Sequence, residues 1–137
     1  MITPPEGMQR DYPLARLTTI PTGGRAKLFA RAGRIERPER LLAWAPEELE
    51  VGVVGSGSNL LVADEGVRGL VRKLDKDLTE IDVDGTRINC GGEPGFRPWP
   101  RAARAGLGGI ELGVNLAGTV GGAARMNANA YAEWTSS

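Results

Sequence analysis

The first half of the chain alternates short apolar runs with glycine-rich and polar turns. This pattern predicts short strands at residues 28–32, 51–54 and 69–74. A loop at residues 55–59 follows the second strand and leads into an extended segment at residues 60–62. A turn at residues 64–66 then precedes the third strand.

Two short helices are also predicted. Residues 38–45 carry a proline in the first turn and apolar side chains for packing, and the following proline ends the helix. Residues 96–100 contain two prolines, which confines the second helix to residues 101–105. Gly106 stops that helix in a capping role. Beyond it, residues 106–131 are rich in glycine, alanine and asparagine.

Asp84 and Gly85 form the clearest local signal, the two-residue turn of a β-hairpin. Counting outward from this turn assigns the residues to two alternating faces. The apolar face pairs Val83 with Thr86, Ile81 with Ile88, and Thr79 with Cys90, while the other face pairs Asp82 with Arg87 and Glu80 with Asn89. We therefore expect the Cys90 thiol to be buried and inert.

The composition is that of an ordinary soluble domain. The 137 residues suit one globular domain, with room for two small lobes around a shared ligand. Seventeen basic and 17 acidic side chains balance, so neither nucleic acid nor a membrane surface is expected as a partner. The sequence has no secretion signal and no apolar run of about 20 residues, and we expect a cytoplasmic protein.

The chain contains no histidine, which excludes Ser-His-Asp triads, Cys-His dyads and histidine-containing zinc sites. We predict no metal site. The single cysteine cannot form an internal disulfide, which suits a reducing compartment. Trp44 is expected in the core, whereas Trp99 and Trp134 lie in segments that we expect to be irregular.

Glycine is unusually frequent, with 20 of 137 residues, and predicts tight turns or close approach of the backbone to a ligand. The sequence GSGSN at residues 55–59 has the composition of a backbone nest for an anion. A plain loop between strands is the alternative. The segment lacks the lysine of a Walker loop and does not match the dinucleotide-binding fingerprint.

A second candidate segment, GTVGGAARMNANAY, covers residues 118–131. Its small side chains would let the backbone lie flat against a planar ligand, and a tightly packed turn is the alternative. Asn127 and Asn129 are candidates for hydrogen bonds to a ring edge or for capping turns. Tyr131 is a candidate for stacking on a ligand or for a half-buried position.

Taken together, three stretches resemble the bacterial UDP-N-acetylenolpyruvoylglucosamine reductases, also called UDP-N-acetylmuramate dehydrogenases. They are PLARLTT, GSGSNLLVADEGVRGLV and AGLGGIELGVNLAGTVGGAARMNANAY. The resemblance runs from Pro13 to Tyr131. The sequence departs from the family's pattern at Ala117, at Ala132 and in the tail EWTSS.

The resemblance implies an α+β FAD-binding module of the vanillyl-alcohol oxidase type, not a Rossmann fold. A first subdomain would cover about residues 13–75, and an incomplete second subdomain would cover about residues 76–137. The first glycine-rich loop would hold the FAD pyrophosphate, and the second would approach the flavin. The implied cofactor residues are Gly55, Ser56, Gly57, Ser58, Asn59, Leu60, Gly118, Thr119, Val120, Gly121, Gly122, Asn127 and Tyr131.

The implied reaction belongs to peptidoglycan precursor synthesis, and hence to cell wall biogenesis, cell shape and cell division. NADPH reduces the flavin, which passes a hydride to the enolpyruvyl group of the UDP-sugar to give UDP-N-acetylmuramate. The family's catalytic arginine, serine and glutamate lie beyond the matched region, so no catalytic residue is assigned. The UDP-sugar is expected to bind through a domain that is missing here.

Two alternatives remain open from the sequence. The chain would be a non-catalytic FAD- or nucleotide-binding module that associates with another chain supplying the missing domain. It would otherwise be a related flavin oxidase with a different substrate cap, although covalent flavin attachment through histidine is impossible without that residue.

Overall fold

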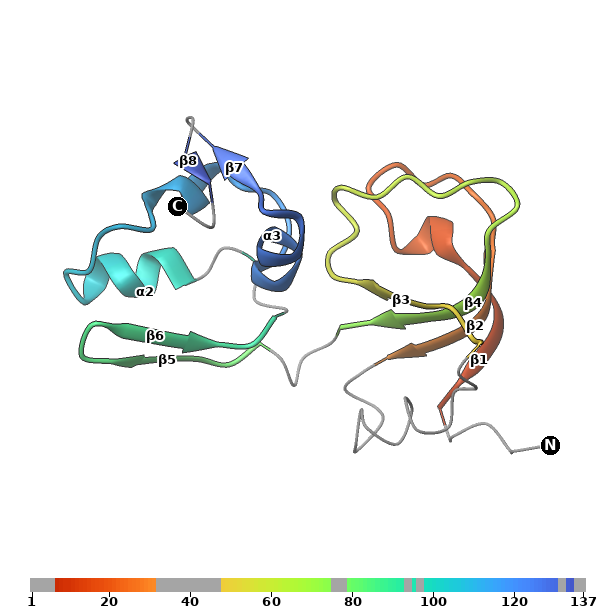
Figure 1. Cartoon of the computed structure of the whole chain (residues 1–137), viewed down its shortest axis with the longest axis horizontal. Coiled ribbons are helices and arrows are strands. Elements are labelled where there is room, and N and C mark those ends of the chain that lie inside the picture. Colours follow the sequence, from red (N-terminus) through yellow and green to blue (C-terminus); the bar gives the residue numbers. More distant parts are fainter. Residues whose placement is uncertain are drawn as a thin grey trace. The chain divides into compact units, whose positions relative to one another are not determined.

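The computed structural model describes residues 7–31, 48–74, 79–92, 95, 98–130 and 133–134. The chain forms two compact units, unit 1 (Met1–Asp75) and unit 2 (Lys76–Ser137), each of which is considered by itself (Figure 1). The mixture of strands and helices agrees with the expected α+β class. The helix predicted at residues 38–45 lies outside the described residues. That the two units are FAD-binding subdomains stays a prediction.

Unit 1 contains a four-stranded sheet with the order β1-β2-β4-β3 (Figure 1). Its strands are β1 (Gln9–Pro13), β2 (Arg25–Arg31), β3 (Val51–Val54) and β4 (Val67–Lys73). β1 pairs antiparallel with β2, whereas β4 runs parallel to both β2 and β3. The three strands predicted from apolar runs are confirmed. β1 was missed because its polar residues and proline show no apolar alternation.

The sheet of unit 1 carries apolar clusters on both faces, since successive side chains of a strand point to opposite sides. Leu28, Ala30 and Leu70 form one cluster. The other cluster contains Leu14, Leu17, Ala26, Phe29, Val54, Val62 and Val71. Phe29 is fully buried and stacks on Tyr12 with ring centroids 3.8 Å apart. Leu14 belongs to the short 3-10 helix η1 (Leu14–Arg16), so the segment after β1 is anchored in this core.

Two loops touch backbone to backbone in unit 1, and we call them loop A (residues 14–24) and loop B (residues 55–66). The Gly24 N–H donates to the Ala63 carbonyl oxygen at 2.9 Å, and the Thr19 N–H donates to that of Gly57 at 3.3 Å. A Cβ atom on Gly24 would collide with the backbone of Asp64 and Gly66. Gly24 therefore makes this contact possible, because it has no side chain.

Unit 2 begins with the predicted hairpin of β5 (Ile81–Asp84) and β6 (Arg87–Cys90). The observed register pairs Ile81 with Cys90 and Val83 with Ile88, two residues away from the predicted pairing. Gly85, with φ 56°, is the first residue of the two-residue loop rather than the second, as in a type II′ turn. A shift of two residues preserves the faces, so the face assignment is correct and the pairing is wrong.

The expectation that Cys90 is buried is wrong. Cys90 is exposed at the last position of β6, where it pairs with Ile81 at the open end of the hairpin. Partial burial still raises the pKa of the Cys90 thiol above its ordinary value.

The second predicted helix exists but starts earlier than expected, as α2 (Pro98–Arg104). Both prolines lie in its first turn. Proline is tolerated there because it lacks an N–H, and the N–H groups of the first turn have no acceptor within the helix. Gly106 has φ 71°. Its N–H donates to the Ala103 carbonyl oxygen, and the Leu107 N–H donates to the Ala102 carbonyl oxygen. This is a Schellman motif, and the capping role of Gly106 is confirmed. α2 packs on the hairpin, and Arg101 Nη1 donates to the Ile81 carbonyl at 2.8 Å.

The remainder of unit 2 contains the 3-10 helix η4 (Glu111–Asn115), the helix α3 (Val120–Met126), and the short strands β7 (Asn129–Ala130) and β8 (Glu133–Trp134). Residues 120–126 were not predicted as a helix, because adjacent glycines lower helix propensity by about 1 kcal/mol each. Among the described residues, no helix is both long and apolar enough to cross a membrane.

We predict that Gly24→Ala destabilises unit 1 by about 1–3 kcal/mol, because the new methyl group collides with backbone atoms that cannot rotate away. Gly52→Ala is the matched control, since a Cβ atom at Gly52 in β3 meets nothing within 4 Å. Urea unfolding followed by circular dichroism measures both. Equal stability of the two variants would contradict the importance of the loop contact.

Candidate functional site

The residues predicted to bind a cofactor lie in both units, in loop B of unit 1 and around α3 of unit 2. Loop B leaves β3 at Gly55 and has no regular secondary structure up to the start of β4. Ser56, Ser58, Asn59 and Leu60 are exposed. The Ser56 and Ser58 hydroxyl oxygens lie 3.0 Å apart and share a hydrogen bond.

The backbone amides of loop B are candidates for binding an anionic ligand. Within the residues that the structure describes, the N–H groups of residues 56–61 donate to no other protein group. Backbone donors without a protein partner must meet water or a ligand. Successive amide groups in a glycine-containing loop are a common means of binding phosphate.

Gly57 itself has a packing role. Its φ is 71°, and a Cβ atom there would collide with the Leu17 carbonyl of loop A. Its own carbonyl oxygen accepts the Thr19 N–H. The glycine is therefore required by loop A whether or not a ligand binds.

The second candidate segment forms a capped helix rather than a flat extended backbone. Gly118 has φ 123°, and the buried Thr119 is the N-cap of α3, with its Oγ1 accepting the Gly122 N–H at 3.2 Å. The Gly121 N–H donates to the Gly92 carbonyl at 2.9 Å, and a Cβ atom on Gly121 would lie 3.0 Å from that oxygen. Val120 is half-buried. The amides of Gly121 and Gly122 are thus used inside unit 2, and contact of this segment with a flavin stays a prediction.

Asn127 caps the C-terminus of α3. It adopts the left-handed conformation with φ 46° and ψ 54°, and its N–H donates toward Ala123 and Ala124. The Ala128 N–H donates to Ala123 at 2.9 Å, which completes a Schellman motif. Of the two roles considered for this residue, the capping role is present. Asn129 is exposed in β7, and Tyr131 lies outside the described residues.

The segment before α3 forms a hollow that the sequence did not reveal. The Trp99 indole of α2 packs against Gly113 of η4. Trp99, Pro100, Ala103, Leu107, Glu111 and Val114 line a mainly apolar hollow of about 310 Å³. Hydrogen bonds from the N–H groups of Glu111 and Gly109 hold the pKa of the Glu111 carboxyl below its usual range. Trp99 is half-buried in a helix, not in an irregular segment as expected.

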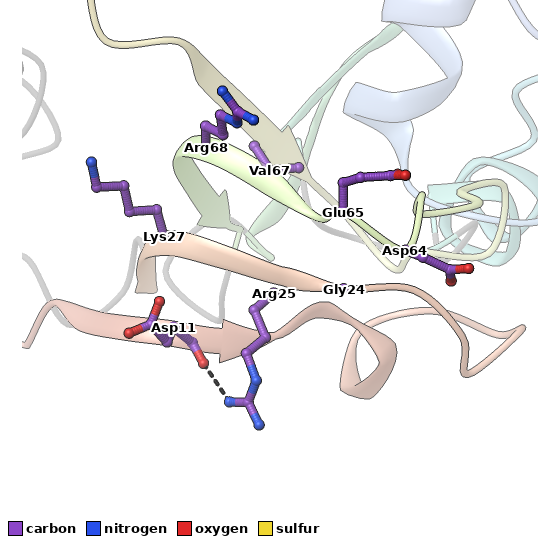
Figure 2. A pocket seen from close by; sticks show the side chains of 8 residues that line it. All are labelled: Asp11, Gly24, Arg25, Lys27, Asp64, Glu65, Val67 and Arg68. Atoms are coloured by element: carbon purple, nitrogen blue, oxygen red, sulfur yellow. Dashed lines mark hydrogen bonds between the residues drawn. The ribbon is translucent and has the colours of Figure 1, made fainter.

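A second hollow, of about 450 Å³, lies in unit 1 and is lined by residues of β1, β2, β4 and the adjoining ends of loops A and B (Figure 2). The strands are irregular beside it. The β2–β4 register shifts between Ala26 and Leu28, and the neighbouring Asp11 of β1 has φ 50°. Arg25 Nη1 donates to the Asp11 carbonyl at 2.7 Å. Three basic and three acidic side chains line this hollow, namely Arg25, Lys27, Arg68, Asp11, Asp64 and Glu65. Their balance of charge favours no particular ionic ligand.

Metal-binding clusters of three or more acidic, cysteine or histidine side chains are absent from the described residues.

The comparisons with known proteins point to one group of enzymes, although no protein-family model matches the chain. It is 41% identical over 133 residues to UDP-N-acetylenolpyruvoylglucosamine reductase 2 of Symbiobacterium thermophilum, covering 96% of this chain and 43% of that protein. It is 45% identical over 122 residues to the Anaeromyxobacter reductase of the same name, covering 87% of this chain and 38% of that protein.

A solved structure gives the same result. The crystal structure of UDP-N-acetylenolpyruvylglucosamine reductase from Thermus caldophilus matches with a TM-score of 0.66 and 32% identity. The match covers 93% of this chain and 44% of that chain. The resemblance predicted from the motifs is therefore confirmed in sequence and in fold. The chain spans 38% to 43% of the length of the two curated relatives described above.

We predict that Asn127→Gly is the less destabilising of two substitutions at this position, since glycine adopts the left-handed conformation readily. Asn127→Ala should cost about 1 kcal/mol, because alanine is strained there. Thermal unfolding of both variants, combined with FAD titration, separates capping from ligand contact. A loss of FAD affinity in Asn127→Gly at unchanged stability would show that the amide side chain also touches the cofactor.

Proposed function

We propose that this chain is the FAD-binding portion of an NADPH-dependent reductase that converts UDP-N-acetylglucosamine enolpyruvate to UDP-N-acetylmuramate. The observation that carries the proposal is similarity to enzymes of this name over as much as 96% of the chain. The 32% identity and TM-score of 0.66 with the Thermus caldophilus enzyme add support from the fold. The cell process would be peptidoglycan synthesis, in the cytoplasm.

The fold we propose is the two-subdomain FAD-binding module of the vanillyl-alcohol oxidase type, with unit 1 and unit 2 as its subdomains. FAD, when bound, would supply the hydride-transfer chemistry. The residues of loop B have a simpler task. The amides of residues 56–61, which have no protein partner among the described residues, would donate to the pyrophosphate oxygens. The hydroxyls of Ser56 and Ser58 are exposed beside them and would add further donors.

We propose that unit 2 provides the flavin end of the site. Gly118, Thr119, Val120, Gly121 and Gly122 would face the flavin with backbone and small side chains, close to Asn127 and Tyr131. The segments that match the relatives carry no candidate for the catalytic groups or for the binding site of the UDP-sugar. No residue of this chain is therefore assigned a proton-transfer role.

We predict that the purified chain binds FAD and shows a flavin absorption spectrum after titration. Ser58→Asp should weaken binding roughly tenfold or more, because a carboxylate close to a pyrophosphate at a protein surface is repelled by more than about 1 kcal/mol. Thr22→Asp is the control for added charge, since Thr22 is exposed in loop A and its side chain has no role in the proposed site. Ser58→Ala should have a small effect. Equal affinities of the two aspartate variants would argue against pyrophosphate binding at loop B.

We further predict that the 137-residue chain, even when loaded with FAD, does not oxidise NADPH in response to the enolpyruvyl UDP-sugar. The expectation follows from the share of the curated relatives that the 137 residues cover, which is 43% for one and 38% for the other. A spectrophotometric assay at 340 nm measures NADPH directly. Turnover at an enzymatic rate would show that this chain contains the catalytic groups after all.

A further inference from the structure

Loop B is held by loop A at two backbone hydrogen bonds. The Gly57 carbonyl accepts the Thr19 N–H, and the Ala63 carbonyl accepts the Gly24 N–H. Ser58 and Asn59 lie between these two points and Ser56 lies just before the first, and all three side chains are exposed. The Ser56–Ser58 hydrogen bond lies within loop B, and the backbone contacts of Gly57 with the rest of unit 1 come from loop A.

The turn at residues 17–20 of loop A makes the contact with Gly57. Leu17 is 8% exposed and belongs to the core, and its carbonyl lies against the Gly57 Cα atom, where a Cβ atom would collide. Thr19 donates its N–H to the same glycine. Thr18 lies between these two residues and does not itself touch loop B through a hydrogen bond.

Thr18 closes this turn with its side chain. Its Oγ1 donates to the Ile20 carbonyl at 2.7 Å, and the Thr22 N–H donates to the same oxygen at 2.7 Å. A threonine hydroxyl bound to a backbone group two residues away is a common way of fixing a local turn. The bond closes a ring through the Thr18–Thr19 and Thr19–Ile20 peptide groups, and the first of these carries the Thr19 N–H that contacts Gly57.

We propose that Thr18 is a positioning residue for the cofactor loop (loop B), acting through the Thr19 N–H on the Gly57 peptide. The identity of the ligand as FAD rests on the proposed function. The positioning itself concerns only this chain. Thr18 orders the amides of loop B before a ligand binds. Loss of the Thr18 hydroxyl should leave the sheet of unit 1 intact and increase the conformational freedom of loop B.

The test compares three variants with the wild-type chain. Thr18→Val keeps the branched shape of the side chain and removes the donor. Thr18→Ser keeps the donor. Thr22→Val is the matched control, since it removes an exposed hydroxyl of the same loop and leaves its backbone N–H in place.

Amide exchange measured by NMR without ligand is the first readout. In Thr18→Val the Thr19 amide should exchange with solvent roughly 3- to 10-fold faster, in keeping with the loss of one ordinary hydrogen bond. Thr18→Ser and Thr22→Val should resemble the wild type, and the amides of β2 and β4 should not change in any variant. A wild-type rate at Thr19 in Thr18→Val, or faster exchange throughout the sheet, would overturn the proposal.

FAD titration is the second readout. Thr18→Val should raise the dissociation constant by about the same 3- to 10-fold, and Thr18→Ser should restore it. Unchanged affinity in Thr18→Val, despite faster Thr19 exchange, would overturn the link to the cofactor. If the wild-type chain binds no FAD, the proposed function fails, and the exchange measurement still decides whether Thr18 positions the loop.

Discussion

Contact between the backbones of loop A and loop B is the constraint on which the organisation of unit 1 depends. The two loops approach closely because Gly24 and Gly57 have no Cβ atoms to separate them. Leu14, Leu17 and Val62 anchor the two loops in the same apolar cluster beneath the contact. The exposed amides of residues 56–61 are thus attached to a buried core through a few backbone hydrogen bonds. Motifs that lie about 40 residues apart in the sequence form one structural feature.

The strands of unit 1 could be predicted because their apolar runs are bounded by strong turn residues. Predictions failed where one residue decides between close alternatives. In the hairpin, Gly85 occupies the first loop position, and this choice moved every pair by two residues. In α3, the capping groups of Thr119 and Asn127 at the two ends outweigh the poor helix propensity of Gly121 and Gly122. Caps act through geometry, which composition does not reveal.

The candidate site was predicted from its glycines, and the structure gives those glycines different physical roles. Gly57 and Gly121 lie against neighbouring backbone, so each is explained by packing within its own unit. The groups that suit a ligand are the adjacent amides and hydroxyls of loop B, which have no comparable explanation. The sequence predicted a loop at residues 55–59, and the structure has a loop there, while its role as a ligand site stays a prediction. The sequence could not separate residues that shape the loop from residues that present donors, because that difference depends on contacts with Leu17 and Gly92.

The position of Cys90 has a practical consequence. The chain contains one cysteine, and it is exposed on unit 2. A thiol-reactive fluorophore would therefore attach at a single place without any prior mutation, although the raised pKa of this thiol calls for a mildly alkaline reaction. A second dye attached to unit 1 would form a donor–acceptor pair with the fluorophore on Cys90. Energy transfer between the dyes would then report the distance between the two labelled residues in solution, with and without a ligand.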